Sequence, residues 1–297
     1  MATLYTHQKE NVFKTWMLMS VFFVLVIVLG FVFAQYFGNP KILYFFVIFS
    51  VVMNITSYWF SDKIVLTLAG AKEAKREEYF DLYNSVQNLS ITAGLPMPKV
   101  YVIADPAPNA FATGRDKEHA VVAATTGLLG ILKKDELEGV IAHELSHIGN
   151  RDMLISTVVV VLVGFVMILS DIFLRHLFWV GGRDRDSKGH GLMLIIGIVL
   201  SILVPIFATL IQLAISRKRE FLADASGALL TRYPEGLANA LKKISQYSQP
   251  MNRQSSAIAH LYISDPKGSK KTGFGQKVMG LFSTHPPVGE RVKALVG

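Results

Sequence analysis

Long apolar stretches and polar segments alternate along this chain. The apolar stretches cover residues 17–37, 42–60, 154–174 and 192–215. Each holds about 20 residues, the length that a helix needs to cross the hydrocarbon core of a bilayer. The pattern therefore predicts a mainly α-helical integral membrane protein with four transmembrane helices, arranged as two hairpins. The longer polar segments are residues 1–16, 61–153 and 216–297, and the connections 38–41 and 175–191 join the helices of each hairpin.

The polar segments predict a second part of the molecule that contains both helices and strands. Apolar positions at helical spacing predict a helix over 71–93, which Gly94 and Pro96 end. Alternating apolar residues predict a small antiparallel sheet, with strands over 99–104, 109–113 and 119–124.

Helix-start signals recur in the later polar segments. Asp135 with Glu138 resembles a capping box at the start of one helix. Further helices are expected over 216–224, 225–231, 234–248 and 287–295. The expected fold is thus four membrane spans plus an α+β domain.

Charge and cysteine content narrow the function classes. The chain has a net charge of +8 and no cysteine, which excludes disulfides and thiolate zinc sites. Nucleic-acid binding is not predicted, because the basic residues are not interleaved with aromatic ones. They gather instead near the ends of the apolar stretches, at Lys63, Lys72, Lys75, Arg76, Arg217, Lys218 and Arg219. Positive residues mark the cytoplasmic face and attract lipid headgroups, so we expect the polar segments to be cytoplasmic.

Five consecutive residues, His143-Glu144-Leu145-Ser146-His147, carry the strongest chemical signal. On a helix, histidines four residues apart lie on one face, so both imidazoles can bind one tetrahedral zinc ion. Glu144 would lie beside the metal, where it can take a proton from the water that zinc activates. The motif predicts metal-assisted hydrolysis, with a further protein ligand supplied by another element.

We expect an acidic pair further along the chain to supply that ligand. Glu220 and Asp224 are also four residues apart in a stretch without helix breakers. Glu220 can reach the metal while Asp224 accepts a hydrogen bond from a ligating imidazole. Alone, such a pair is more often a solvent-exposed helix face. The histidine motif is what favours a metal role.

Membrane topology is consistent with this ligand set. His147 and Glu220 can share a metal only if they lie on the same side of the bilayer, so an even number of crossings must separate them. The stretches 154–174 and 192–215 supply two crossings. Short segments join the ligands to these spans, so we expect the metal close to the membrane surface.

Four motifs together resemble the HtpX family of heat-shock membrane zinc metalloproteases. They are H-E-x-x-H at 143–147, Glu-Phe-Leu-Ala-Asp at 220–224, Pro-Asn-Ala-Phe-Ala at 108–112 and Thr-His-Pro-Pro at 284–287. The resemblance covers nearly the whole chain. It implies a zincin-like (gluzincin) domain with one Zn²⁺ on His143, His147 and Glu220, and Glu144 as general base. It also implies a bacterial inner-membrane endopeptidase that cuts misfolded or damaged membrane proteins on the cytoplasmic side, in stress-related quality control.

Three further roles are hypotheses with open alternatives. The residues Asn109, Ala110, Phe111 and Ala112 could form an edge strand that pairs with substrate, or an ordinary loop and strand. His285 could help hold the oxyanion or close over the site, or it could simply cap a helix. Arg217 could orient Glu220, or it could contact a phospholipid.

Two other functions must be weighed. A CAAX prenyl protease carries related motifs, but such enzymes have more than four spans. A membrane adaptor with a structural zinc site would need four protein ligands, whereas a catalytic site keeps one position open. The ligand set would also accept cobalt or manganese. Substrate identity, cleavage preference, the restraint on self-cleavage and oligomeric state do not follow from the sequence.

Overall fold

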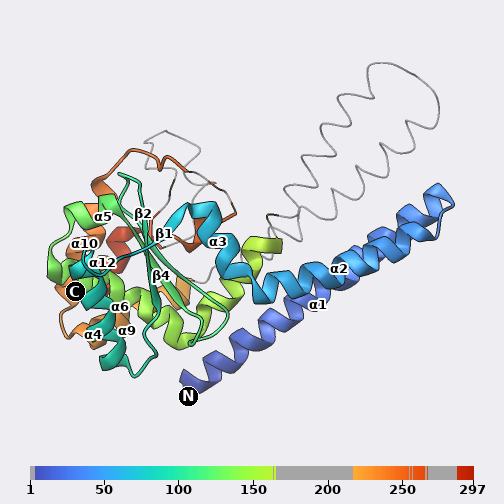
Figure 1. Cartoon of the computed structure of the whole chain (residues 1–297). Coiled ribbons are helices and arrows are strands. Elements are labelled where there is room, and N and C mark those ends of the chain that lie inside the picture. The colour runs from blue at the N-terminus through green and yellow to red at the C-terminus, as the bar shows by residue number, and fades with distance from the viewer. Residues whose placement is uncertain are drawn as a thin grey trace, which may run out of the picture.

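A computed structural model describes residues 4–162, 164, 217–253, 255, 257–264, 266 and 286–297. Helices α1 (Leu4–Phe37) and α2 (Lys41–Trp59) form a hairpin that projects from the remainder of the molecule (Figure 1). Within them, Lys9–Gln35 and Lys41–Trp59 are long and apolar enough to cross a membrane. Both expected N-terminal spans are therefore present as helices. The first helix begins well before the expected residue 17, because its polar first turns continue the same helix.

The third expected span is described only at its start. Helix Asp152–Leu162, here called the Asp152 helix, follows α6 (Lys134–Asn150) after a bend of 86°. It packs against α1, where Leu154, Val158 and Leu162 meet Leu18 and Phe22 in one apolar cluster. By length and composition α6 and the Asp152 helix could cross a membrane only as one bent pair. The rest of the third span, and all of 192–215, lie outside the described residues.

The sheet has four strands in the order β1-β2-β4-β3. They are β1 (Ala71–Glu73), β2 (Lys99–Ile103), β3 (Ala110–Thr113) and β4 (Val121–Thr125). The pairs β1–β2 and β3–β4 are antiparallel, whereas β2 and β4 are parallel. The expectation of an antiparallel sheet was therefore wrong, and the sheet is mixed.

The crossing between β2 and β3 explains the parallel pair. Successive strands reverse direction as expected, but β4 lies between β2 and β3. The Thr125 hydroxyl, at the end of β4, donates to the Ala107 carbonyl and accepts from the Asn109 N–H, both at 2.8 Å. The Gly127 N–H donates to the Asp105 carbonyl at 2.9 Å. Residues 105–109 thus carry the chain past the end of β4 to its far side.

The helix expected over 71–93 is shorter than predicted. Helix α3 (Ser61–Ala69) ends at Gly70, and residues 71–73 then pair with β2 as strand β1. The Ala74 N–H continues this ladder by donating to the Val100 carbonyl at 2.9 Å. Helix α4 (Phe80–Ala93) begins only after a turn and ends at Gly94 as expected. Pairing with a distant strand overrides the local helical pattern.

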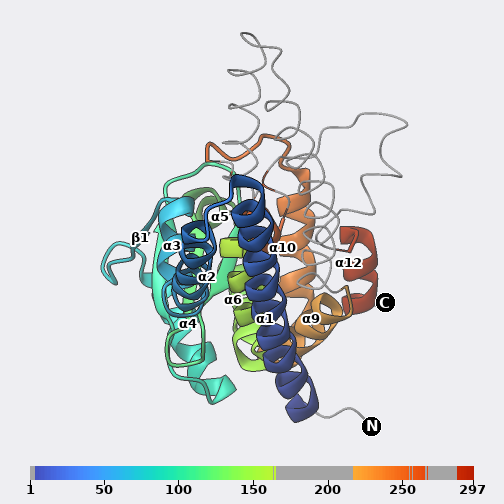
Figure 2. The same ribbon diagram turned by 90° about the vertical axis from the view of Figure 1, so that its right-hand side faces the viewer.

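The globular domain, meaning residues 61–151 and the described residues from 217 onward, packs its helices around α6 (Figures 1 and 2). Apolar residues of α6 form the core, as expected from Leu137, Val140, Ile141 and Leu145. Around it lie α4, α9 (Arg217–Thr231) and α10 (Pro234–Gln246), with α12 (Val288–Val296) on α9 and α10. The short helices α5 (Thr126–Ile131) and η1 (Ala259–Leu261) complete the described elements.

The start of α6 differs from the expected capping box. The Glu136 carboxylate accepts a hydrogen bond from the Lys133 N–H at 2.7 Å, so the N-cap is Lys133, two residues before the expected Asp135. Glu136 also forms an ion pair with Lys243 of α10 at 2.6 Å. This second partner favours Glu136 over Glu138 for the role.

Candidate metal centre

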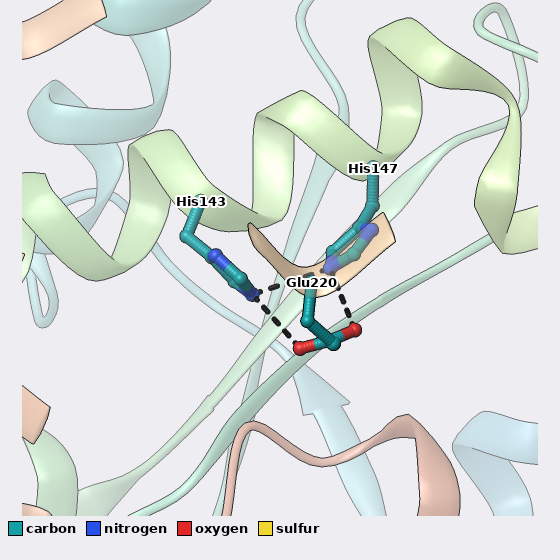
Figure 3. Close-up of side chains that lie close together, drawn as sticks. All are labelled: His143, His147 and Glu220. Carbon is teal, nitrogen blue, oxygen red and sulfur yellow. Dashed lines mark hydrogen bonds and ion pairs between the residues drawn. The ribbon is translucent and has the colours of Figure 1, made fainter. Parts of the chain in front are cut away.

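Three side chains from two distant helices converge on one point. His143 and His147 lie one turn apart on α6, and Glu220 faces them from α9 (Figure 3). The two Nε2 atoms are 3.2 Å apart. The Glu220 carboxylate oxygens lie 3.8 Å from Nε2 of His143 and 3.6 Å from Nε2 of His147. We call these three residues the metal cluster.

The spacing of the metal cluster fits a tetrahedral cation. Donors that surround zinc at about 2.0–2.1 Å lie roughly 3.3–3.4 Å from one another. The two Nε2 atoms lie close to that separation, each has a different Glu220 oxygen within 3.8 Å, and one donor atom from each residue can be chosen so that all three lie within 4.8 Å of one another. Within the described part of the chain the cluster has three protein donors, so a tetrahedral cation there would keep one position open. The donor set and its geometry therefore fit zinc.

His143 is held by a carboxylate within the globular domain. Its Nδ1 lies 2.9 Å from Oδ1 of Asp224, which is one turn after Glu220 on α9. Arg291 of α12 grips the same carboxylate with two hydrogen bonds, from Nε at 2.8 Å and from Nη2 at 2.6 Å. Burial alone would raise the pKa of Asp224, but Arg291 and His143 hold that pKa well below its ordinary value. Asp224 is therefore a fixed negative charge that orients His143.

His147 is held by a different carboxylate. Its Nδ1 lies 3.3 Å from Oδ2 of Asp152, the first residue of the Asp152 helix. The other Asp152 oxygen accepts a hydrogen bond of 2.6 Å from Nδ2 of Asn11 on α1. Arg219, the residue before Glu220, lies 4.0 Å from the same oxygen. Each histidine thus presents Nε2 to the metal cluster and Nδ1 to a carboxylate.

This arrangement favours a positive charge between the rings. If each Nδ1–H donates to its carboxylate, both Nε2 atoms carry lone pairs that face each other and the Glu220 carboxylate. Burial opposes a charged His147, yet the hydrogen bond to Asp152 and the charges of Glu220, Asp152 and Glu144 raise its pKa to about 9. Without a metal, a proton on His147 partly neutralises the surrounding carboxylates. A divalent cation between the rings would neutralise them more completely.

Glu144 lies between the two histidines on α6 and is 3% exposed. Burial raises the pKa of Glu144, as does the neighbouring Glu220 charge, while His143, His147 and Arg291 act in the opposite direction. A raised pKa brings a carboxylate closer to the proton affinity that a general base needs near neutral pH. The site therefore contains a buried carboxylate suited to proton transfer beside the metal cluster.

Close contact between α6 and α9 sets the position of Glu220. Gly227 lies two turns after Glu220, and a Cβ built there would stand 3.0 Å from the backbone nitrogen of His143 and 3.2 Å from its Cα. Only glycine allows the two backbones to approach this closely without displacement. The contact holds the helix of the third ligand directly against the helix of the first.

Three of the expected substrate residues lie on β3, and Asn109 directly precedes this strand. Asn109 is buried, and its side chain donates to the Ser264 carbonyl at 2.9 Å and accepts from the Ser264 N–H at 3.2 Å. The Ala110 carbonyl accepts from the Ile263 N–H at 3.0 Å. Phe111 is buried against Tyr262, with their rings edge to face. Ala112 is the remaining residue of the expected set, and it is buried on the same strand.

The two other expected residues are Arg217 and His285, and their expected roles stay predictions. Arg217 is exposed at the first position of α9. Arg219, two residues later, is the arginine of this helix that enters the network around Asp152. His285 lies outside the described residues.

Sequence reasoning missed four supporting residues: Asn11, Asp152, Arg219 and Arg291. Arg291 follows the Thr-His-Pro-Pro motif by one helical turn, which is a weak signal. Asp152 comes five residues after His147, beyond the helical spacing that identified Asp224. Asn11 is a polar residue at the start of an apolar helix, and nothing in the sequence connects it with the histidines.

Comparison with known proteins relates the whole chain to membrane proteases. The family model for Peptidase family M48 matches residues 77–297. A curated "Protease HtpX homolog" from Caldanaerobacter subterraneus subsp. tengcongensis is 48% identical over 99% of this chain and 97% of its own. One from Tropheryma whipplei (strain Twist) is 45% identical over 98% and 97%. The resemblance read from the four sequence motifs is confirmed.

A solved structure extends the comparison to the fold. The crystal structure of S. mikatae Ste24p matches with a TM-score of 0.52 and 19% sequence identity. The match covers 96% of this chain and 67% of that one. The likeness supports a shared arrangement of elements.

Proposed function

The chain belongs to peptidase family M48, and on that premise we propose that it is a zinc-dependent endopeptidase which cuts misfolded or damaged membrane proteins at the cytoplasmic side of a bacterial inner membrane. Membership makes the chain a metalloprotease. The metal's identity, the roles of single residues, the substrates and the orientation in the membrane are our proposal. One observation carries it: two imidazoles and a carboxylate meet with donor atoms within 4.8 Å of one another, beside a buried glutamate.

Each residue of the site has one role in this proposal. His143, His147 and Glu220 hold one zinc ion, and Asp224 orients His143. When bound, zinc supplies a Lewis acid that lowers the pKa of water and polarises a peptide carbonyl. Glu144 takes the proton from the attacking water and passes it to the leaving amine. Burial suits this role, because the raised pKa of Glu144 makes the carboxylate a stronger base.

The edge of β3 is the proposed site of substrate pairing. Asn109 N–H and C=O point toward β4, as shown by their bonds to Thr125. Backbone groups alternate along a strand, so Ala110 and Ala112 point away from β4. Ala110 already accepts a hydrogen bond from Ile263. Ala112 is thus the position on this edge best suited to an added strand of substrate, which would be recognised through its backbone and largely without regard to sequence.

The membrane topology of the proposal rests on contacts between distant segments. Asn11, in the first part of α1, donates a hydrogen bond to Asp152, which directly follows the first segment of the globular domain. The first part of α1 and the metal cluster therefore lie on the same side of the membrane. Glu220 meets the histidines from beyond the stretches 154–174 and 192–215, which agrees with two crossings. Lys and Arg gather on this same side, which supports a cytoplasmic location.

The decisive experiment compares two variants in detergent or lipid discs. Glu144→Gln should abolish cleavage of an unfolded membrane protein while zinc, measured by metal analysis, stays bound at one ion per chain. His143→Ala should lose both zinc and cleavage, and a chelator should stop cleavage by the unaltered protein. Normal cleavage by Glu144→Gln would refute the mechanism.

The same preparations distinguish catalysis from a purely structural zinc site. A structural site has four protein ligands, whereas the proposed site has an open position that water can occupy. X-ray absorption of the zinc-loaded Glu144→Gln protein should show two nitrogen ligands and additional oxygen ligands beyond Glu220. A fourth protein ligand would favour an adaptor without catalytic activity.

A further inference from the structure

Asn11 is a buried polar residue in the polar first part of α1, before the apolar stretch of this helix begins. Its side chain is 5% exposed. The amide nitrogen donates to Oδ1 of Asp152 at 2.6 Å and to the Asn150 carbonyl at 3.3 Å. The amide oxygen accepts from Nη1 of Arg219 at 3.4 Å. Both ends of the amide are therefore engaged, with partners from elements that lie far away in the sequence.

We propose that Asn11 is a positioning residue of the metal centre, through which the first membrane helix fixes the orientation of His147 and the approach of Glu220. The inference rests on the metal centre proposed above. It gives the membrane helix a role in metal binding beyond anchoring the chain.

The link to His147 runs through one carboxylate. A carboxylate can rotate about its terminal bond, and its orientation is broad unless both oxygens are held. Asn11 holds Oδ1 of Asp152, which leaves Oδ2 facing Nδ1 of His147 at 3.3 Å. Asn11 also binds the carbonyl of Asn150, the last residue of α6, and so fixes the corner from which Asp152 extends. The ring of His147 is thereby oriented from the membrane side.

The link to Glu220 runs through its neighbour. Arg219 donates to Asn11 and lies 4.0 Å from Asp152, so one amide joins α9 to the corner after α6. The Arg219 side chain is largely buried, at 14% exposed. A buried cation of this kind depends on fixed polar partners. Asn11 is one of them.

Packing alone does not account for the amide. The apolar cluster of Leu18 and Phe22 on α1 with Leu154, Val158 and Leu162 already holds α1 against the Asp152 helix. Replacing the amide by an apolar group of similar size should therefore leave α1 in place. It should change only the orientation of Asp152 and Arg219, the two side chains that the amide binds.

The test uses the full chain and two matched variants on one face of α1. Asn11→Leu removes the amide at similar volume. Thr15→Val is the control, because Thr15 lies one turn further on and is 1% exposed, and among the described residues its hydroxyl bonds only to the Asn11 carbonyl of its own helix. Zinc dissociation is followed with a chelator, and the ligand geometry is followed by the visible absorption of the Co²⁺-substituted protein.

We expect Asn11→Leu to weaken zinc binding about tenfold and to shift the cobalt absorption, since outer partners of metal-binding histidines typically have effects of this size. Thr15→Val should change neither. Unchanged zinc binding in Asn11→Leu, or an equal loss in Thr15→Val, would overturn the proposal.

A second variant protects the test against misfolding. Asn11→Asp keeps the oxygen that faces Arg219 but replaces the donor to Asp152 with a negative charge. It should also weaken zinc binding and shift the cobalt absorption, and unchanged values would count against the proposal. Glu144→Gln separates the two proposals, because it tests catalysis with all three metal ligands and Asn11 in place.

Discussion

The two histidines of the metal cluster are supported in different ways. On the His143 flank, meaning His143, Asp224 and Arg291, every partner belongs to the globular domain and is at most 2% exposed. On the His147 flank, meaning His147, Asp152, Asn11 and Arg219, the partners join three elements, and the His147 side chain is 17% exposed. One flank is a closed core network. The other depends on a membrane helix.

This difference separates folding from metal binding. The His143 flank buries a carboxylate and a guanidinium together, so loss of either partner leaves an unpaired charge in the core. The His147 flank is more exposed to solvent, and its residues orient a metal ligand without forming part of the hydrophobic core. We therefore expect damage to the first to cost stability and damage to the second to alter the metal.

The largest effect is expected from Arg291→Leu on the His143 flank. This change leaves Asp224 buried without its guanidinium partner and should lower the free energy of unfolding by about 3–5 kcal/mol. Unfolding of the metal-free protein by denaturant, followed in detergent, would measure it. Lys293→Leu, an exposed cation on the same helix, should change stability by no more than about 0.5 kcal/mol. Equal effects of the two variants would contradict a special role for the buried pair.

The next effect is expected from Gly227→Ala. A new methyl 3.0 Å from the His143 nitrogen must push α9 away from α6, at a cost of about 1–3 kcal/mol. Because Glu220 moves with α9, zinc affinity should fall as well. The control lies beside the other histidine: Gly149→Ala meets no atom within 4 Å, and it should stabilise the helix by about 0.4–1 kcal/mol. Zinc affinity equal in both variants would show that this helix contact does not set the site.

The smallest expected effect is the release of a proton from His147 when zinc binds. Below pH 9 the metal-free His147 ring is charged, because Asp152, Glu220 and Glu144 outweigh burial and raise its pKa to about 9. Zinc needs the neutral ring, so binding at pH 7.5 should release about one proton from His147, and affinity should rise about tenfold per pH unit toward pH 9. Calorimetry in two buffers of different ionisation enthalpy counts the protons.

Asp152→Asn sharpens the same measurement. Without the Asp152 charge the His147 pKa falls toward its ordinary 6.5, so fewer protons are released at pH 7.5. In metal-free protein the raised pKa stabilises the fold fully below pH 6.5, and that contribution is lost as pH rises through about 9. Equal proton release by the native protein and Asp152→Asn would remove Asp152 as the cause.

Local spacing explains which parts of the site could be predicted. His143 and His147, and then Glu220 and Asp224, each lie four residues apart on one helix, and helical geometry brings each pair to one face. Arg291 carries no such pattern, because its contacts with the site are to Asp224 and His143, which lie 67 and 148 positions away in sequence. Asn11 is 141 positions from its carboxylate. Contacts of that range are set by packing.

In the fold, too, the elements set by local sequence signals were predicted, whereas those set by distant contacts were not. Helices α10 and α12 begin and end within a few residues of the predicted bounds, since local signals define them. Strand β1 has only three residues and exists through its pairing with β2, so its own sequence predicted a helix. The order of β3 and β4 depends on the 105–109 segment, which crosses the end of the sheet and is hydrogen-bonded there by the Thr125 hydroxyl. The pattern of apolar residues does not indicate this contact.

The apolar cluster between α1 and the Asp152 helix has a practical consequence for truncated forms of the protein. A form that lacks residues 1–60 would lose the apolar partners that α1 gives to Leu154, Val158 and Leu162. It would also lack Asn11. Because His147 would then lose the support that reaches it from α1 through Asp152, such a fragment is a poor substitute for the whole protein.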